Sequence, residues 1–252
     1  MADEVDIRIS LDLDPNAVMG SIEDYDDDTA PYLDPAKRVF EETHSALGAI
    51  HDAKAAAATD PRLNEYGALL KVDDYARKRF EKIFPMWDAV LSSLTSKAEA
   101  WEKEMSKAVE QKASQMVSGE IRAHFKSLDN GARMVAIRQA IRDGDEVVAT
   151  AVLGAPAMLS GLSPEMQAVH LREWHERSDP AMAKRLRAVT QMRDAVSERS
   201  ASLHRERDKA VGTIKIEGKN FDRHGKYDAE LTPAQVRAMA EKSDAPFRVT
   251  GV

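Results

Sequence analysis

The chain has 252 residues, of which 43% are apolar, 31% charged and 6% aromatic, and it contains no cysteine. The missing cysteine excludes disulfides, thiolate metal sites and a cysteine nucleophile. No run approaches the roughly 20 apolar residues of a membrane span, so a membrane is not expected as a partner. Residues 1–4 are acidic and do not begin the basic-then-apolar pattern of a signal peptide, which predicts a cytoplasmic product.

Negative charge is concentrated in residues 1–33, which we expect to form an acidic extended arm. The formal net charge is −7; residues 1–34 carry −10, so the remainder is +3. Such an arm would be repelled by nucleic acid, which is not an expected partner, and attracted to basic protein surfaces. For residues 23–28 we favour the simpler alternative of a solvated, partly disordered leader.

Within this arm, apolar and polar residues alternate strictly from Val5 to Leu13. A period of two predicts a β-strand over residues 5–13, with Ile7, Ile9 and Leu11 on one face. Its best internal match is the segment 213–217, but two strands alone are marginally stable in water. The strand would otherwise add to a sheet edge on another subunit.

Residues 34–128 are predicted to form a long helical arm. Asp34–Pro35 and Asp60–Pro61 each combine an N-cap residue with proline at the first helical position, so one helix should run to about Ala58 and another should follow. Pro85 lies inside the second helix and should kink or break it. The apolar pattern continues through Pro85 without a change of phase, which favours the kink.

An apolar seam with alternating spacings of four and three residues runs along the second helix. This spacing is typical of the a and d positions of a coiled coil and requires a partner surface. The seam consists of Phe80, Phe84, Trp87, Leu91, Leu94, Ala98, Trp101, Met105 and Ala108. We therefore predict an interface made by Phe80, Phe84, Trp87, Leu91, Leu94, Trp101 and Met105 of the seam, and by Ile7, Ile9 and Leu11 of the arm.

Three further segments follow. Residues 129–178 are predicted to form a compact helical hairpin region, in which Gly144 caps one helix and Asp145 starts the next. Residues 179–211 should form a second long helix beginning at Asp179–Pro180 and docking antiparallel on the first. From Glu165 to Lys209, acidic residues balance most of the basic ones, so the net charge of this stretch is only about +2. This balance indicates a solvent-exposed face with many salt bridges. Residues 212–252 should form an extended tail with a short helix after Pro233.

No motif for catalysis or metal binding is complete. His175–Glu176 begins like a zinc-protease motif, but Asp179 occupies the position of the second histidine, so His170 and His175 are predicted to be surface residues. The alternating acids of residues 24–28 lack the glycine and glutamate of a calcium loop. Glycine-rich phosphate loops and a serine nucleophile elbow are absent. We expect no catalytic residue, metal, cofactor or small-molecule substrate.

The segment Ile137–Asp145, together with Leu153–Ser163, resembles a segment of uncharacterised helical proteins encoded by bacteriophages and prophages. The resemblance covers residues 137–163 and contains no catalytic motif, so no functional residue carries over. It implies a phage particle or morphogenesis protein.

These patterns predict a mainly α fold: elongated antiparallel long helices with a coiled-coil seam, a small helical hairpin subdomain, and short β or extended terminal arms. The expected function is a non-enzymatic structural subunit of a large assembly, namely a bacteriophage head or tail. Its partners would be copies of itself and other assembly proteins, and its location the cytoplasm and then the virion. The alternative is a cytosolic coiled-coil adaptor or regulator that binds a partner protein.

Overall fold

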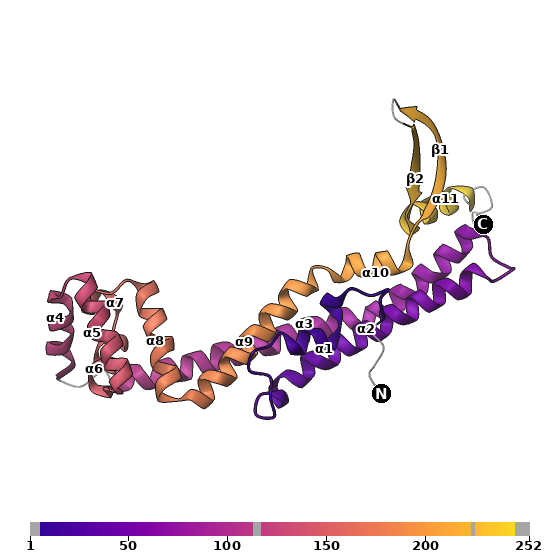
Figure 1. The fold of residues 1–252 in the computed structure, drawn as a ribbon. Coiled ribbons are helices and arrows are strands. Elements are labelled where there is room, and N and C mark those ends of the chain that lie inside the picture. Colours follow the sequence, from indigo (N-terminus) through magenta and orange to yellow (C-terminus); the bar gives the residue numbers. More distant parts are fainter. Residues whose placement is uncertain (1–5, 113–116, 223–224, 245–252) are drawn as a thin grey trace, which may run out of the picture. The chain divides into compact units, whose positions relative to one another are not determined.

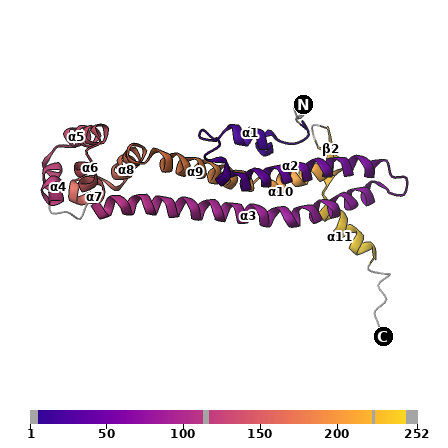
Figure 2. The same cartoon turned by 90° about the horizontal axis from the view of Figure 1, so that it is seen from below.

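The computed structural model describes residues 6–112, 117–222 and 225–244, and these are mainly α-helical, as predicted (Figures 1 and 2). The chain divides into two compact units. Unit 1 comprises residues 1–21, 35–90 and 195–252, and unit 2 comprises residues 22–34 and 91–194. The longest helices are α2 (Ala30–Ala58), α3 (Glu65–Lys112) and α9 (Pro180–Ser200), and each contributes residues to both units.

In unit 1, α2 and the first part of α3 run antiparallel and side by side (Figures 1 and 2). The Trp87 ring of α3 meets the Phe40 ring of α2 edge-on, with centroids 4.8 Å apart. Its indole Nε1 donates a hydrogen bond of 2.9 Å to Thr43 Oγ1, which itself donates to the Val39 carbonyl. The polar end of this buried tryptophan is therefore satisfied, as burial of an N–H group requires.

Helix α10 (Leu203–Val211) lies beside this pair, where the His204 ring stacks on Phe84 with centroids 4.3 Å apart. The chain then forms an antiparallel hairpin of β1 (Ile214–Asp222) and β2 (Gly225–Leu231), with Ile214 opposite Leu231. Helix α11 (Pro233–Asp244) follows and is held by Arg237, whose Nη2 lies 2.7 Å from the buried Asp73 carboxylate.

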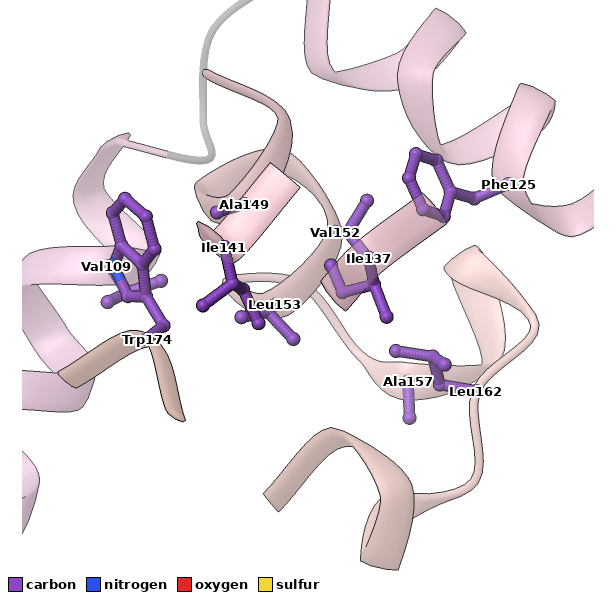
Figure 3. Packing of buried hydrophobic residues seen from close by; sticks show 10 residues of the cluster. All are labelled: Val109, Phe125, Ile137, Ile141, Ala149, Val152, Leu153, Ala157, Leu162 and Trp174. Atoms are coloured by element: carbon purple, nitrogen blue, oxygen red, sulfur yellow. The ribbon is translucent and has the colours of Figure 1, made fainter. Parts of the chain in front are cut away.

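In unit 2, five short helices surround one apolar cluster (Figure 3). They are α4 (Val117–Ser127), α5 (Asn130–Asp143), α6 (Glu146–Leu153), α7 (Ala157–Ser160) and α8 (Pro164–Ser178). The turn between α5 and α6 is as predicted: Gly144 ends α5 in the left-handed conformation, at φ 71°, and the Asp145 carboxylate accepts from the Val148 amide. The predicted hairpin is thus part of a larger helical cluster.

The strand predicted over residues 5–13 is wrong for residues 6–13, which the structure describes. This segment forms turns, a short 3-10 helix η1 (Leu11–Leu13), and then α1 (Pro15–Gly20). The Asp6 carboxylate accepts from the Arg8 amide, and the Ser10 hydroxyl accepts from the Asp12 amide. The polar residues of the alternating pattern therefore form local side-chain to backbone bonds that compete with a strand ladder.

Three predicted helix boundaries also differ. Helix α2 begins at Ala30, so Pro35 lies inside it rather than at its first turn. Helix α3 begins at Glu65 and continues through Pro85, which excludes a break there. The predicted helix 179–211 is divided into α9 and α10 at residues 201–202.

Candidate interaction surfaces

Most of the predicted seam is buried within the chain. Phe80, Trp87, Leu94 and Met105 are each less than 10% exposed. Phe84, Leu91 and Trp101 are half-buried, whereas Ile83 and Val90, which the heptad pattern left out, are buried. The buried stripe of α3 is therefore rotated slightly from the predicted seam. These side chains serve packing within one chain and leave little free surface for a second.

The three interface residues predicted in the N-terminal arm differ in their exposure to solvent. Ile9 is 6% exposed, whereas Ile7 is 95% and Leu11 63% exposed. Exposed aliphatic side chains on a well-anchored backbone are candidates for a contact with another molecule.

The first described residues of the arm, 6–14, belong to unit 1 and are held there by polar contacts of Arg8, between these two residues, and of Asp12, after them. Arg8 pairs with Asp6 at 2.6 Å and with Asp52 of α2 at 2.8 Å. Arg199 Nε donates a hydrogen bond of 2.8 Å to the Asp12 carbonyl. The paired Arg8 guanidinium holds the pKa of the Asp6 carboxyl well below its usual range. The arm therefore presents Ile7 and Leu11 from a defined position.

A groove of about 500 Å³ lies in unit 1, at the base of the β-hairpin, between α2, α3 and the start of β1. Its apolar lining includes Leu69, Val72, Val211 and Ile214, all less than 10% exposed. The exposed side chains of Lys54 and Lys215 complete it. No local sequence pattern predicted this groove, because its walls come from segments more than 130 residues apart in the chain.

In unit 2, alternating acids of the segment preceding α2 pair with three closely spaced bases of α9. Arg187 Nε lies 2.5 Å from Asp24 Oδ2, and Arg185 Nη2 lies 2.6 Å from Asp28 Oδ1. Lys184 pairs with Asp26. These bonds lower the pKa of Asp26 and Asp28 and raise that of Lys184.

The prediction of a solvated leader is therefore wrong for these three acids. The other expectation was that these acids would be attracted to a basic protein surface, and that surface is α9 of the same chain. The three ion pairs neutralise three of the basic side chains of α9.

The prediction that His170 and His175 lie on the surface is wrong. His170 is fully buried and His175 is 6% exposed, and the Nε2 atom of each is without a hydrogen-bond partner. His170 Nδ1 lies 2.7 Å from Glu173 Oε2. Burial lowers the pKa of His175, which lines a second groove of about 510 Å³ between α3, α8 and α9.

Among the described residues, no three His, Cys, Asp or Glu side chains gather in a way that could hold a metal ion. Likewise, none of the described helices combines the length and apolar character needed to cross a membrane. The chain matches no protein-family model, no curated protein and no solved structure.

Proposed function

We propose that this chain is a non-enzymatic structural subunit of a large assembly and that it contacts further copies of itself through its N-terminal arm. The observation that carries the proposal is the exposure of Ile7 and Leu11 next to two contacts that hold the arm, the ion pair of Arg8 with Asp52 and the hydrogen bond from Arg199 to the Asp12 carbonyl. Covering these two side chains would remove apolar surface from water, and the anchored backbone would lose little conformational freedom in the process.

The assembly we propose is a bacteriophage particle, in its head or its tail. This part of the proposal rests on the resemblance of residues 137–163 to segments of phage and prophage proteins. The α3 seam was first expected to join subunits. In this proposal its buried side chains stabilise the single subunit instead.

An adaptor that binds one partner protein is the second candidate. It is favoured by aliphatic side chains exposed on the helices of unit 2. Val135 of α5 is 66% exposed, Val147 of α6 is 56% exposed and Met158 of α7 is 73% exposed. These residues would contact a different protein, whereas the arm would contact a copy of the same chain.

Light scattering coupled to size-exclusion chromatography tests the first proposal. The wild-type chain should form species larger than a dimer as its concentration rises. The double variant Ile7→Asp, Leu11→Asp should be monomeric, because a buried carboxylate without a partner is strongly unfavourable at a contact.

Met239→Asp is the matched control, since Met239 is a half-exposed apolar residue of α11. It should associate like the wild type. A wild-type chain that stays monomeric up to its solubility limit would refute the assembly proposal. If such a monomer bound one partner protein and lost it on Met158→Asp, the adaptor would be supported.

A further inference from the structure

The groove at the base of the β-hairpin combines an apolar floor with a rim that carries two basic residues and one acid. Leu69, Val72, Val211 and Ile214 line the floor. Lys54, Lys215 and the exposed Glu65 leave the rim with a net positive charge. Neither lysine forms an ion pair with a residue whose side chain the structure describes, which leaves out residues 217–229 of the hairpin. A ligand that suits this groove should have aliphatic side chains next to a negative charge.

Gly212 leaves room for one of these lysines beside the turn from α10 into β1. It has φ 83°, a conformation that side chains rarely adopt, and Lys54 Nζ occupies the space that a Cβ at this position would need. The turn from α10 into β1 therefore brings its backbone close to Lys54. The absence of a side chain at Gly212 therefore leaves space for the Lys54 ammonium group at the rim of the groove.

The N-terminal arm has the matching chemistry. Ile7 and Leu11 are exposed, and the adjacent Asp12 is exposed and forms no ion pair within the described chain. The one cation of the arm, Arg8, is already neutralised by Asp6 and Asp52, so it would not repel the lysines strongly.

We propose that the groove binds the N-terminal arm of a second copy of this chain. Ile7 and Leu11 would contact the apolar floor, and Asp12 would pair with Lys54 and Lys215. This inference rests on the proposed self-assembly and names the surface that receives the arm.

The arm and the groove lie on different faces of α2. The arm contacts α2 at Asp52, whereas Lys54 of the groove is two residues further on. Two residues correspond to a rotation of about 200° around a helix with 3.6 residues per turn. A contact between two different surfaces of the same chain is heterologous, so it leaves a free arm and a free groove on every pair. Such a contact can continue into a ring or a filament.

Charge reversal at the groove provides the first test. The double variant Lys54→Glu, Lys215→Glu should weaken self-association at least about tenfold, because its rim would then repel Asp12. Both side chains are exposed, so the fold should be retained. Lys78→Glu, Lys82→Glu is the matched control: it makes the same change in charge at exposed positions of α3 outside the groove and should associate like the wild type.

Cysteine cross-linking provides the second test, and the absence of native cysteine makes it specific. Ile7→Cys and Ala58→Cys are introduced into separate chains that differ by a size tag, since Ala58 lines the groove. Mixing and mild oxidation should link the two chains. A mixture of Ile7→Cys with Ser197→Cys, an exposed position outside the groove, should not form the mixed product.

Three results would overturn the inference. One is self-association that is unchanged by charge reversal at the groove, which would leave the proposed assembly intact. Another is equal cross-linking at Ala58→Cys and Ser197→Cys. The third is a chain carrying both Ile7→Cys and Ala58→Cys that closes the bond within itself at high dilution. A monomeric wild type would instead refute the proposed function from which the inference starts.

Discussion

Arg133 is a buried arginine that hydrogen-bonds to backbone carbonyls and not to a carboxylate. It is 8% exposed, and its guanidinium donates to the carbonyls of Phe125, Leu128 and Gly161 at 2.8, 2.5 and 2.7 Å. The first two carbonyls belong to the end of α4 and the turn after it, where helical carbonyls lack partners within the helix. One side chain therefore joins the end of α4 to the turn after α7.

We predict that Arg133→Met destabilises the chain by about 2–4 kcal/mol, because carbonyls that are buried or partly buried lose the guanidinium as a donor. Chemical unfolding followed by circular dichroism measures the effect. Arg138→Met is the control, because Arg138 is exposed on the same helix. If the two variants unfolded alike, Arg133 would have no special structural role.

The histidines of α8 show why single residues are hard to assign from sequence. His170 and His175 are five positions apart on a helix rich in charge, a pattern typical of surface residues. His175 lies beside α3, which is distant in the chain and contributes Met105 and Ser106 to the groove that His175 lines. A local sequence pattern does not show which distant segment of the chain will pack against it.

At the scale of elements, local capping chemistry predicted several helix starts correctly. The Ser163 hydroxyl accepts from the Met166 amide at the start of α8, and the Asp179 carboxylate accepts from the Met182 amide at the start of α9. Asp34–Pro35 has the same appearance but lies inside α2. Thr29 is buried and donates to the Asp24 carbonyl, which shapes the preceding turn so that α2 can begin earlier.

The acidic segment before α2 is a second element whose position was not predictable. Its acids are local, but the bases that pair with them follow about 160 residues later in the chain. Since many basic residues are available between Arg172 and Lys209, the sequence alone does not select Lys184, Arg185 and Arg187.

We predict that these ion pairs make the stability of unit 2 depend on pH and salt. The paired bases lower the pKa of Asp26 and Asp28, so their contribution is complete above the ordinary aspartate value of about 3.9. It is lost as the pH falls through their lowered values. At neutral pH, Asp26→Asn, Asp28→Asn should lower the thermal unfolding midpoint, and the loss should shrink in about 1 M salt.

Asp27→Asn is the control for this prediction, because Asp27 is exposed and forms no ion pair with the described residues. Measuring the midpoints of all variants from neutral to acid pH separates pairing from net charge. An equal loss for Asp27→Asn, or a loss that persists at acid pH, would show that the ion pairs are not responsible.

At the scale of the whole molecule, the mainly α fold was predictable from the sequence. The spacing of apolar residues along a helix is a local signal, and the high charge content suits long helices with a solvent-exposed face. The function of the α3 seam was not predictable in the same way. An apolar stripe must be covered, but its spacing does not state whether the cover comes from the same chain or from another. Here Trp87 packs on Phe40 and Phe84 on His204, so the cover is internal.

A heterologous contact between arm and groove makes a final prediction about mixtures. The arm variant Ile7→Asp, Leu11→Asp retains its groove, and the groove variant Lys54→Glu, Lys215→Glu retains its arm. Each alone should be monomeric or nearly so. Mixed in equal amounts, they should form a pair of one arm variant and one groove variant, because only one arm–groove contact is then available.

Light scattering of the mixture should therefore stop at the mass of two chains, whereas the wild type should continue to larger species. Replacing the groove variant in the mixture by Lys78→Glu, Lys82→Glu should restore growth beyond two chains, since that control retains both surfaces. A wild type that stops at two chains would indicate reciprocal exchange of arms in a closed dimer. A mixture that stays monomeric would show that the arm of one chain does not bind the groove of the other.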